Sequence, residues 1–200
     1  MFSWYHFIRR LFWLVLRLRY NLRYEGMENL PASGAYIIAC NHVSFIDPPA
    51  VGAGITRDVY YLARKTLFAP PVMDKFLPSI NAIPVDQDKP DMTGLKKIIQ
   101  ILRRGDPVVL FPEGSRSVDG TLQPAMPGIG LLVAKGAVPV VPARIFGAYE
   151  AYPRGGKLKL SGSLRIVFGR PVDFSASEEL KSKNYQAIGD QIMAHIATLQ

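Results

Sequence analysis

A histidine and an aspartate close to residue 45 have the spacing and the surroundings of a general base and its partner. Four residues separate His42 from Asp47, and both follow the strand-like apolar run Ala35–Cys40. Residues five apart on a regular helix point about 140° away from each other, so the two side chains meet only if the chain turns between them. We expect that turn, because Asp47 precedes Pro48 and Pro49, and an Asp cap followed by Pro favours the start of a helix.

This pair could perform general base catalysis. An imidazole is largely neutral at neutral pH, and a carboxylate that binds one ring nitrogen leaves the other nitrogen free to accept a proton. The same pattern has a structural interpretation, in which Asp47 only caps a helix and His42 is an ordinary loop residue. The two residues alone do not decide between these interpretations.

A second polar cluster strengthens the catalytic interpretation. About seventy residues after the first motif, the apolar run Val108–Phe111 leads into the segment Pro112–Ser117, of sequence PEGSRS. In this order and at this separation, the two motifs resemble the glycerolipid acyltransferases, particularly the 1-acylglycerol-3-phosphate acyltransferases that make phosphatidic acid. Residues 81–87 and 138–144 look like the remaining two blocks of that family, so the resemblance covers most of residues 25–170.

The resemblance implies a reaction. An acyl group would pass from acyl-CoA or an acyl carrier protein to the free hydroxyl of a lysophospholipid, foremost 1-acylglycerol 3-phosphate, with no cofactor and no metal ion. His42 would remove the hydroxyl proton, and Asp47 would orient the imidazole. Two other classes fit less of the sequence: a catalytically silent lipid-binding protein, and a lipase, for which Gly114-Ser115 lacks the surrounding G-x-S-x-G pattern.

The second motif would bind the acceptor. The resemblance implies that Glu113, Gly114 and Ser115 shape the acceptor loop and that Arg116 holds the acceptor phosphate. A planar guanidinium suits that role because it forms paired, charge-assisted hydrogen bonds with phosphate oxygens. The alternative for Arg116 is a surface ion pair with Glu113 or Asp119.

The second block departs from the family pattern. The family usually has Gly at its start and Arg at its end, where this chain has Asn81 and Gln87. Gln is a neutral hydrogen-bonding residue and cannot replace the charge of a guanidinium on a phosphate. Either Lys65 or Lys89 supplies the missing charge, or the acceptor is another lysolipid or glycerol 3-phosphate. The departure concerns the acceptor and leaves both chemical motifs unchanged.

Short apolar runs alternate with helical patterns, which predicts one α/β domain over residues 25–200 with a mostly parallel central sheet flanked by helices. A helix is expected from Thr93 to Gly105, and another over Gly128–Lys135, whose glycines favour close approach of two backbones. Ser175–Glu178 has the form of a capping box before a C-terminal helix. The expected strands are Ala35–Cys40, Asp58–Ala63, Ile80–Val85, Pro107–Phe111, Val138–Ile145 and Leu164–Phe168.

The first 24 residues combine basic and apolar side chains and contain no acidic one. Their longest uncharged central run, Leu11–Leu16, is far shorter than the roughly 20 residues that cross a bilayer. Trp, Tyr and Arg together favour an amphipathic helix over residues 1–24 that lies in the membrane interface. Of the eight excess positive charges of the chain, five belong to this segment, at Arg9, Arg10, Arg17, Arg19 and Arg23.

We therefore expect an anionic membrane surface as a partner, with the protein peripheral or monotopic on the cytoplasmic face of the inner membrane. The alternative is an ordinary helix packed on the domain. No nucleic-acid motif accompanies the basic residues, which speaks against a nucleic-acid partner. The single cysteine, Cys40, excludes an intramolecular disulfide, and its place in an apolar run favours a core residue over a nucleophile.

Overall fold

Seven strands of the computed structural model, which describes residues 3–86 and 92–200, form one sheet in the order β1-β7-β6-β2-β5-β3-β4. The neighbours from β6 to β4 in this order are parallel, whereas β7 pairs antiparallel with β6 and parallel with β1. The expected mostly parallel α/β fold is confirmed. The strands are β1 (Arg23–Glu25), β2 (Ile37–Cys40), β3 (Tyr60–Arg64), β4 (Ala82–Val85), β5 (Val108–Leu110), β6 (Val140–Phe146) and β7 (Arg165–Phe168).

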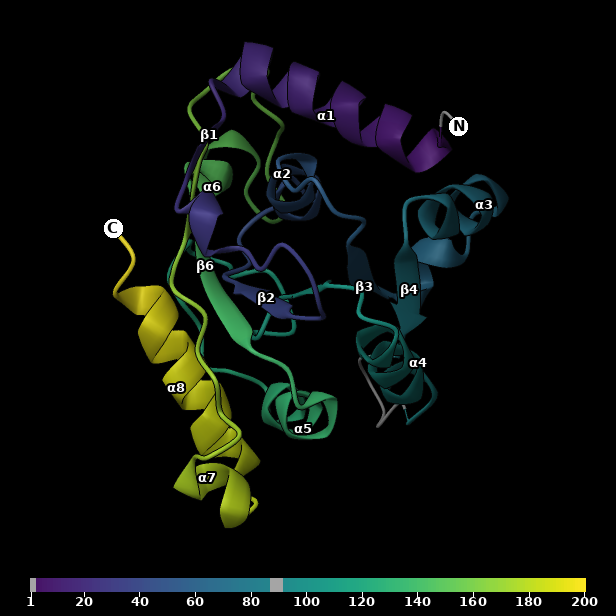
Figure 1. The fold of residues 1–200 in the computed structure, drawn as a ribbon. Helices are drawn as coiled ribbons and strands as arrows, with labels where there is room; N and C mark the ends of the chain where they lie inside the picture. Colours follow the sequence, from purple (N-terminus) through teal and green to yellow (C-terminus); the bar gives the residue numbers. More distant parts are fainter. Residues whose placement is uncertain (1–2, 87–91) are drawn as a thin grey trace.

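Helices cover both faces of this sheet (Figure 1). Residues of α1, α2 and α6 join the core on one face, and residues of α4, α5 and α8 join the core on the other. The helices are α1 (Trp4–Tyr20), α2 (Asp47–Ala53), α3 (Pro71–Ser79), α4 (Met92–Arg103), α5 (Pro127–Gly136), α6 (Ala148–Ala151), α7 (Glu178–Lys181) and α8 (Tyr185–Ala197), with short 3-10 turns η1 (Met27–Asn29) and η2 (Lys65–Phe68).

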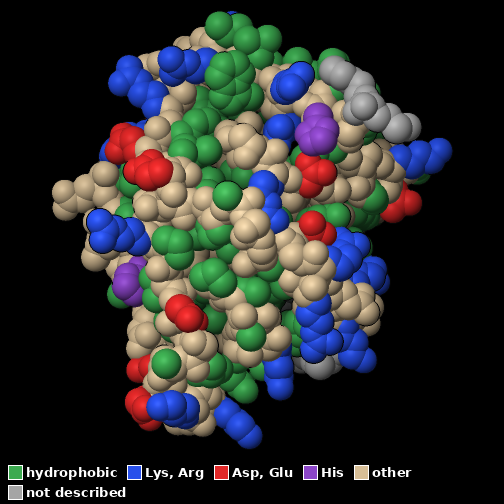
Figure 2. Space-filling model, in the orientation of Figure 1, with side chains coloured by type: hydrophobic (Ala, Val, Ile, Leu, Met, Phe, Trp, Pro, Cys, Tyr) green, Lys and Arg blue, Asp and Glu red, His purple; other side chains and the backbone are tan. Residues whose placement is uncertain are grey.

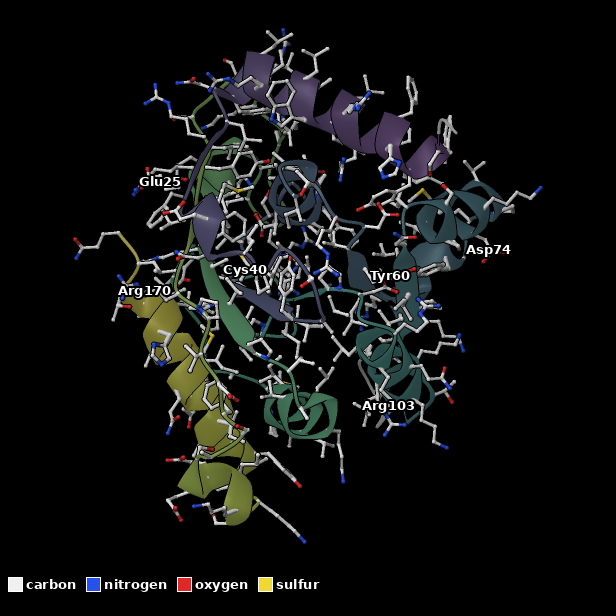
Figure 3. All side chains as sticks on the ribbon, viewed as in Figure 1. Glu25, Cys40, Tyr60, Asp74, Arg103 and Arg170 are labelled. Carbon is white, nitrogen blue, oxygen red and sulfur yellow. The ribbon has the colours of Figure 1, made fainter. Side chains whose placement is uncertain are left out.

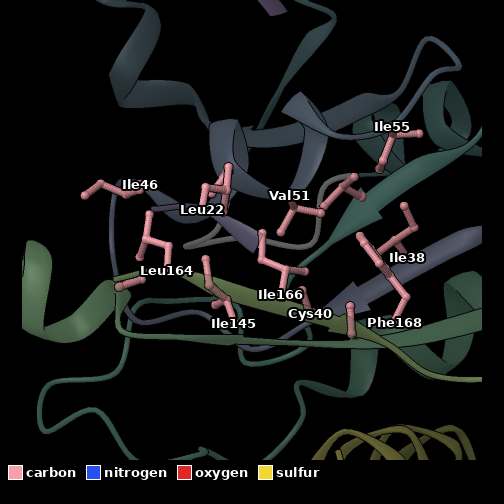
Figure 4. Packing of buried hydrophobic residues seen from close by; sticks show 14 of the residues in the cluster. Leu22, Ile38, Cys40, Ile46, Val51, Ile55, Ile145, Leu164, Ile166 and Phe168 are labelled. Carbon is pink, nitrogen blue, oxygen red and sulfur yellow. The ribbon is translucent and has the colours of Figure 1, made fainter. Parts of the chain in front are cut away.

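Strand β2 lies in the middle of the sheet, and its side chains enter both cores. Ile37 and Ala39 pack on the α5 and α8 face, while Ile38 and Cys40 pack on the α2 face (Figure 4). Successive side chains of a strand point to opposite faces, so a strand covered on both sides must be apolar throughout. Figure 3 shows Cys40 in the interior of the molecule, as expected for a core residue.

The C-terminal region contains two helices where the sequence predicts one. Ser177 caps the short helix α7, and its hydroxyl accepts the N–H of Leu180 at 3.2 Å. Lys183 then adopts a left-handed φ of 57°, which ends the first helix. Helix α8 starts after Asn184, whose side chain accepts the N–H of Ala187 at 3.1 Å. The expected capping box at Ser175 is therefore wrong, because the cap belongs to Ser177 and to a separate helix.

Helices α5 and α8 approach each other at a glycine. A Cβ atom at Gly130 would lie 1.9 Å from the carbonyl oxygen of Tyr185, so a side chain there would push the helices apart. The expected close approach of backbones is confirmed at this residue. Gly128 has no such role, because no atom lies within 4 Å of the place its Cβ would occupy.

Helix α1 packs on the domain through polar as well as apolar contacts. The hydroxyl of Tyr5 accepts the N–H of Val59 at 3.1 Å, and Arg9 Nη1 donates to the carbonyl of Ile55 at 2.5 Å. Arg9 is thus directed to the domain, a correction to its expected place among the membrane-facing charges. The helix ends at Tyr20, so the last residues of the expected segment 1–24 belong to β1.

A second face of α1 is apolar and exposed. Figure 2 shows hydrophobic side chains with basic ones beside them along the edge of the molecule where α1 lies. On a helical wheel six of the seven exposed apolar residues of α1 fall within about 100°, centred about 130° from the buried ones, and Trp13 lies outside this arc. Among the described residues, no helix is long and apolar enough to cross a bilayer. The outer apolar face, called here the α1 stripe, consists of Trp4, Phe7, Leu11, Leu14, Val15 and Leu18.

The strands β2 and β5 are neighbours, but the helices that follow them lie on opposite faces. Helix α2 follows β2 and packs on one side, whereas α5 follows β5 and packs on the other. Such a divergence opens a crevice at the carboxyl ends of the two strands. Both motifs found in the sequence begin at these strand ends.

Candidate active site

The expected pair of imidazole and carboxylate forms at the end of β2. His42 Nδ1 lies 2.8 Å from Asp47 Oδ2, and the Asp47 side chain is fully buried. The same oxygen accepts the N–H groups of Val43 at 2.6 Å and Ser44 at 2.7 Å. Asp47 is the first residue of α2, and Ile46 holds the cap position. The expectation that Asp47 caps α2 is thus wrong, because its carboxylate turns back to hold the loop that carries the histidine.

This geometry determines the tautomer of the neutral imidazole. A carboxylate oxygen only accepts hydrogen bonds, so in the neutral ring His42 Nδ1 carries the proton and Nε2 keeps its lone pair. Three donors on Asp47 Oδ2 stabilise its negative charge. The ring also stacks on Phe111, with 4.1 Å between centroids and 24° between planes. The imidazole is therefore fixed in orientation, with Nε2 as its free base.

Glu113 joins the second motif to the first. Its Oε1 accepts the backbone N–H of His42 at 3.0 Å, and the N–H of Ser117 donates to the carbonyl of His42 at 2.8 Å. The other carboxylate oxygen, Glu113 Oε2, is buried and has no hydrogen-bond partner within the described chain. Burial raises the pKa of Glu113 to about 7, with a smaller contribution from the charge of Asp47, although two N–H groups act in the opposite direction. The two motifs thus form one connected unit around His42.

The chain makes a tight turn directly after Glu113, and this turn determines which residue type fits there. Gly114 has φ +69°, a conformation that costs little only for glycine, and its N–H donates to the carbonyl of Phe111 at 3.0 Å. A Cβ atom there would also lie 2.8 Å from Met126 Cγ. Ser115 is exposed beside this turn. A glycine between Glu113 and Ser115 is therefore required by the backbone.

A cavity of about 810 Å³ opens at this edge of the sheet. His42, Glu113, Gly114 and Ser115 all line it, as expected for a site built from both motifs. The rest of the lining is mostly apolar, and a mainly apolar cavity with a few polar groups is typical of small-molecule sites. The apolar wall comes from β3, β4, β5, α4, α5 and the loop before α5, with Leu62, Val85, Leu95, Ile98, Leu110, Met126, Ile129 and Leu132.

Arg116 lies beside the cavity and is not among the residues that line it. Its guanidinium carbon is 3.4 Å from the ring centroid of Phe45, a residue of the first motif. No ion pair joins Arg116 to Glu113 or Asp119 in the part of the chain that the structure describes, so the alternative surface pair is not formed. Asp119 instead accepts hydrogen bonds from Thr121. The structure places Arg116 next to the histidine loop through stacking on Phe45.

The candidate residues of the second block lie on the other side of the site. Lys65 lines a second cavity of about 480 Å³, which shares Arg64, Val85 and Asp86 with the first. Asn81 has φ +62°, a conformation that Asn tolerates better than most residues, so it can occupy the usual glycine position of the family. The predictions for Gln87 and Lys89 fall outside the described residues.

Two cavity-lining arginines were missed by the sequence analysis. Arg64 ends β3, and Arg154 follows the end of β6 by eight residues. Both strands were predicted, and parallel strands place their carboxyl ends at one edge of the sheet. A search for basic residues at the carboxyl ends of the predicted parallel strands would have found Arg64, whereas Arg154 lies beyond the short helix α6 and has no such local signal.

The remaining reactive side chains have structural settings. Burial raises the pKa of Cys40 well above its usual value, and the charges of Asp47 and Glu113 act in the same direction, so its thiol stays protonated. His6 pairs with Asp58 at 2.9 Å, away from the cavity. Among the described residues, no group of three His, Cys, Asp or Glu side chains could hold a metal ion.

Comparisons with known proteins agree with the resemblance that the two sequence motifs show. A family model described as acyltransferase matches residues 21–146. The chain is 32% identical over 180 residues to the 1-acyl-sn-glycerol-3-phosphate acyltransferase of Bacillus subtilis, with 90% of this chain and 87% of the relative covered. A chloroplastic 1-acyl-sn-glycerol-3-phosphate acyltransferase of Brassica napus is 29% identical over 184 residues, covering 89% and 53%. A crystal structure of the 1-acyl-sn-glycerophosphate acyltransferase of Thermotoga maritima superposes with a TM-score of 0.73 at 25% identity, covering 98% and 79%.

Proposed function

The chain belongs to the acyltransferase family, and from this membership we propose that it transfers a fatty acyl group from a thioester to the free hydroxyl of 1-acylglycerol 3-phosphate, giving phosphatidic acid. The donor is acyl-CoA or an acyl carrier protein. The observation that carries the proposal is the His42–Asp47 pair, whose imidazole lines the same cavity as Glu113, Gly114 and Ser115. The names of the relatives support the choice of acceptor.

The proposed reaction uses the free Nε2 of His42 as the base. This nitrogen takes the hydroxyl proton of the acceptor while the hydroxyl oxygen attacks the thioester carbonyl. The new C–O bond replaces the C–S bond, and the thiolate that leaves receives the proton from the imidazolium. Asp47, held by two N–H groups, stabilises the imidazolium while it exists. General base catalysis of this kind contributes about 10²- to 10⁴-fold to a rate.

The apolar wall of the cavity suits an acyl chain. Side chains of β3, β4, β5, α4 and α5 supply this wall next to the imidazole. Burying one methylene group contributes about 0.8 kcal/mol, so a chain of many methylenes gains considerable binding energy along such a wall. The thioester or ester carbonyl would then lie at the polar end of the cavity, near His42.

The proposal includes binding of α1 to a membrane surface. The α1 stripe is exposed, although the Trp4 indole N–H at its start donates to Ser79 Oγ at 3.1 Å. Arg10, Arg17 and Arg19 are exposed on the same helix, and Arg23 is exposed just after it. An apolar face flanked by basic side chains is typical of helices that lie in the interface of an anionic bilayer. Both thioester donors are cytoplasmic, so we place the protein on the cytoplasmic face. Helix α1 also packs on α2, whose first residue is Asp47, which would keep the site close to lipid.

A thioester-release assay tests the proposal. The purified protein is mixed with acyl-CoA, with vesicles and with one of three acceptors: 1-acylglycerol 3-phosphate, dissolved glycerol 3-phosphate, or a neutral lysolipid such as lysophosphatidylcholine. We expect free CoA and phosphatidic acid to appear together, at the highest rate with 1-acylglycerol 3-phosphate. A preference for another acceptor would refute the proposed substrate. Release of free fatty acid without any acceptor would refute the transfer reaction itself.

A further inference from the structure

Two arginines are neighbours at one side of the cavity, Arg154 in its lining and Arg116 beside it. Arg154 lines the cavity, and its Nη1 donates to the backbone carbonyl of Arg116 at 3.1 Å. Arg116 is held in turn by stacking on Phe45, and Phe45 packs against Tyr152, with 5.9 Å between ring centroids. The two basic residues are thus positioned by separate contacts, next to the loop that carries His42.

Neither arginine has an ion-pair partner within the described chain. No carboxylate forms an ion pair with Arg154 or Arg116 among residues 3–86 and 92–200. Burial, and after it the nearby charge of Arg154, lowers the pKa of Arg116, while Tyr152 and the carboxylate of Asp47 act more weakly in the opposite direction. Two like charges so placed repel each other unless an anion binds between them. The arrangement is therefore complementary to a small anion such as a phosphate.

The opposite side of the cavity is electrostatically different. Arg64 lies there, but the carboxylate of Asp86 lines the same two cavities as Arg64 does. A carboxylate at that side reduces its attraction for an anion. The Arg154 side, in contrast, combines two positive charges with no acidic residue in its part of the cavity lining other than Glu113, whose pKa of about 7 leaves it partly neutral.

We propose that Arg154, together with Arg116, binds the phosphate of the lysophospholipid acceptor. This inference rests on the proposed function and adds the residue that fixes the acceptor in place. Arg154 would supply the second positive charge that the family resemblance assigns to the position of Gln87. Arg154 lines the same cavity as His42, so a phosphate bound there would hold the acceptor hydroxyl in the cavity that contains the base.

The chemistry of the two substrates favours the acceptor phosphate over the phosphates of CoA. In 1-acylglycerol 3-phosphate the free hydroxyl and the phosphorus are joined through two carbons and one oxygen, which limits their separation to about 5 Å. The phosphate must therefore bind close to His42. In acyl-CoA the whole pantetheine arm separates the thioester from the nearest phosphate. An arginine that shares a cavity with the imidazole is accordingly suited to the acceptor.

The test compares Arg154→Ala with Arg154→Lys and with Arg170→Ala, a matched change at an exposed arginine. We expect Arg154→Ala to raise the KM for 1-acylglycerol 3-phosphate about 10- to 100-fold, because charge-assisted hydrogen bonds to phosphate are lost. The KM for acyl-CoA and the melting temperature should stay close to those of the unchanged protein. Arg154→Lys should recover part of the loss, and Arg170→Ala should change neither constant.

A direct binding measurement separates this inference from the proposed function. Glycerol 3-phosphate is titrated into the unchanged protein and into Arg154→Ala by calorimetry, without an acyl donor. We expect about 10-fold weaker binding to the variant. Equal binding to both proteins, no binding to either, or a rise in the acyl-CoA KM alone would overturn the role of Arg154. Weaker binding to the variant together with no acyl transfer to 1-acylglycerol 3-phosphate would instead overturn only the proposed function.

Discussion

The two motif loops, residues 41–47 and 112–117, and helix α1 differ in opposite ways from the usual distribution of polar and apolar side chains. All buried polar or charged residues of the described chain lie in the motif loops, at Asn41, Ser44, Asp47, Glu113 and Ser117. Helix α1 has the reverse arrangement, since it carries seven of the fourteen large apolar side chains that the described chain exposes: the six of the α1 stripe and Trp13.

Burying a polar group and exposing an apolar side chain both cost free energy, and the two regions differ in how this cost is offset. A buried polar group costs about 1–3 kcal/mol unless it is hydrogen-bonded, and in the motif loops backbone N–H groups satisfy most of these groups. The α1 stripe has no comparable compensation within residues 3–86 and 92–200. A contiguous apolar surface of this kind is expected where a protein meets a membrane or another protein. Within the described chain, the motif loops thus satisfy most of their buried polar atoms, with Asp47 Oδ1 and Glu113 Oε2 as exceptions, whereas the α1 stripe stays exposed.

The largest expected effect in this comparison comes from His42. His42→Ala removes the proposed base, so we expect kcat for acyl transfer to fall about 10²- to 10⁴-fold. The backbone bond from residue 42 to Glu113 does not depend on the side chain, so the fold should persist. His195→Ala, at an exposed position of α8, is the matched control and should retain full activity. A His42→Ala protein with most of its activity would refute the base role.

The second effect concerns the buried carboxyl of Glu113. Its folded pKa of about 7 lies above the usual value, so the folded state binds the proton more tightly than the unfolded state does. The resulting stabilisation is complete at low pH and is lost as the pH rises through 7. Glu113→Gln cannot lose a proton, so its free energy of unfolding relative to the unchanged protein should rise between pH 5 and pH 8. The expected rise is on the order of 3 kcal/mol.

Urea unfolding at the two pH values measures this difference. Comparing two pH values cancels the part of the substitution effect that does not depend on pH. Glu150→Gln, at an exposed position, serves as the control and should show the same difference at both pH values. If the free energy of unfolding of Glu113→Gln also shows no pH-dependent gain, burial does not keep the carboxyl protonated. The motif loops would then be more accessible to water than the structure indicates.

The smallest effect is expected at α1. Leu14→Glu places a charge in the middle of the α1 stripe, and we expect binding to anionic vesicles to weaken about 10- to 100-fold, because burial of one leucine contributes about 1.5–3 kcal/mol. Trp13→Glu introduces the same charge on the same helix but outside the stripe, and it should weaken sedimentation with vesicles less. Equal losses for both variants would show that net charge, and not the apolar stripe, determines membrane binding.

Much of the fold could be predicted because its signals are local. The central strands are continuous apolar runs, since both faces of the sheet are covered, and the pairing of His42 with Asp47 follows from five residues and a turn. Strand β1 was missed because three residues at the sheet edge, Arg23–Glu25, have no apolar run. The stacking of Arg116 on Phe45 was missed because it joins two distant loops.

The setting of Cys40 has a practical consequence for spectroscopy. It is the single cysteine of the chain, it is fully buried, and its thiol stays protonated, so maleimide and methanethiosulfonate reagents should not reach it in the native protein. A cysteine introduced at Leu18, which is 73% exposed, would then be the one accessible thiol. A nitroxide attached there would report its immersion depth by electron paramagnetic resonance, without prior removal of the native thiol.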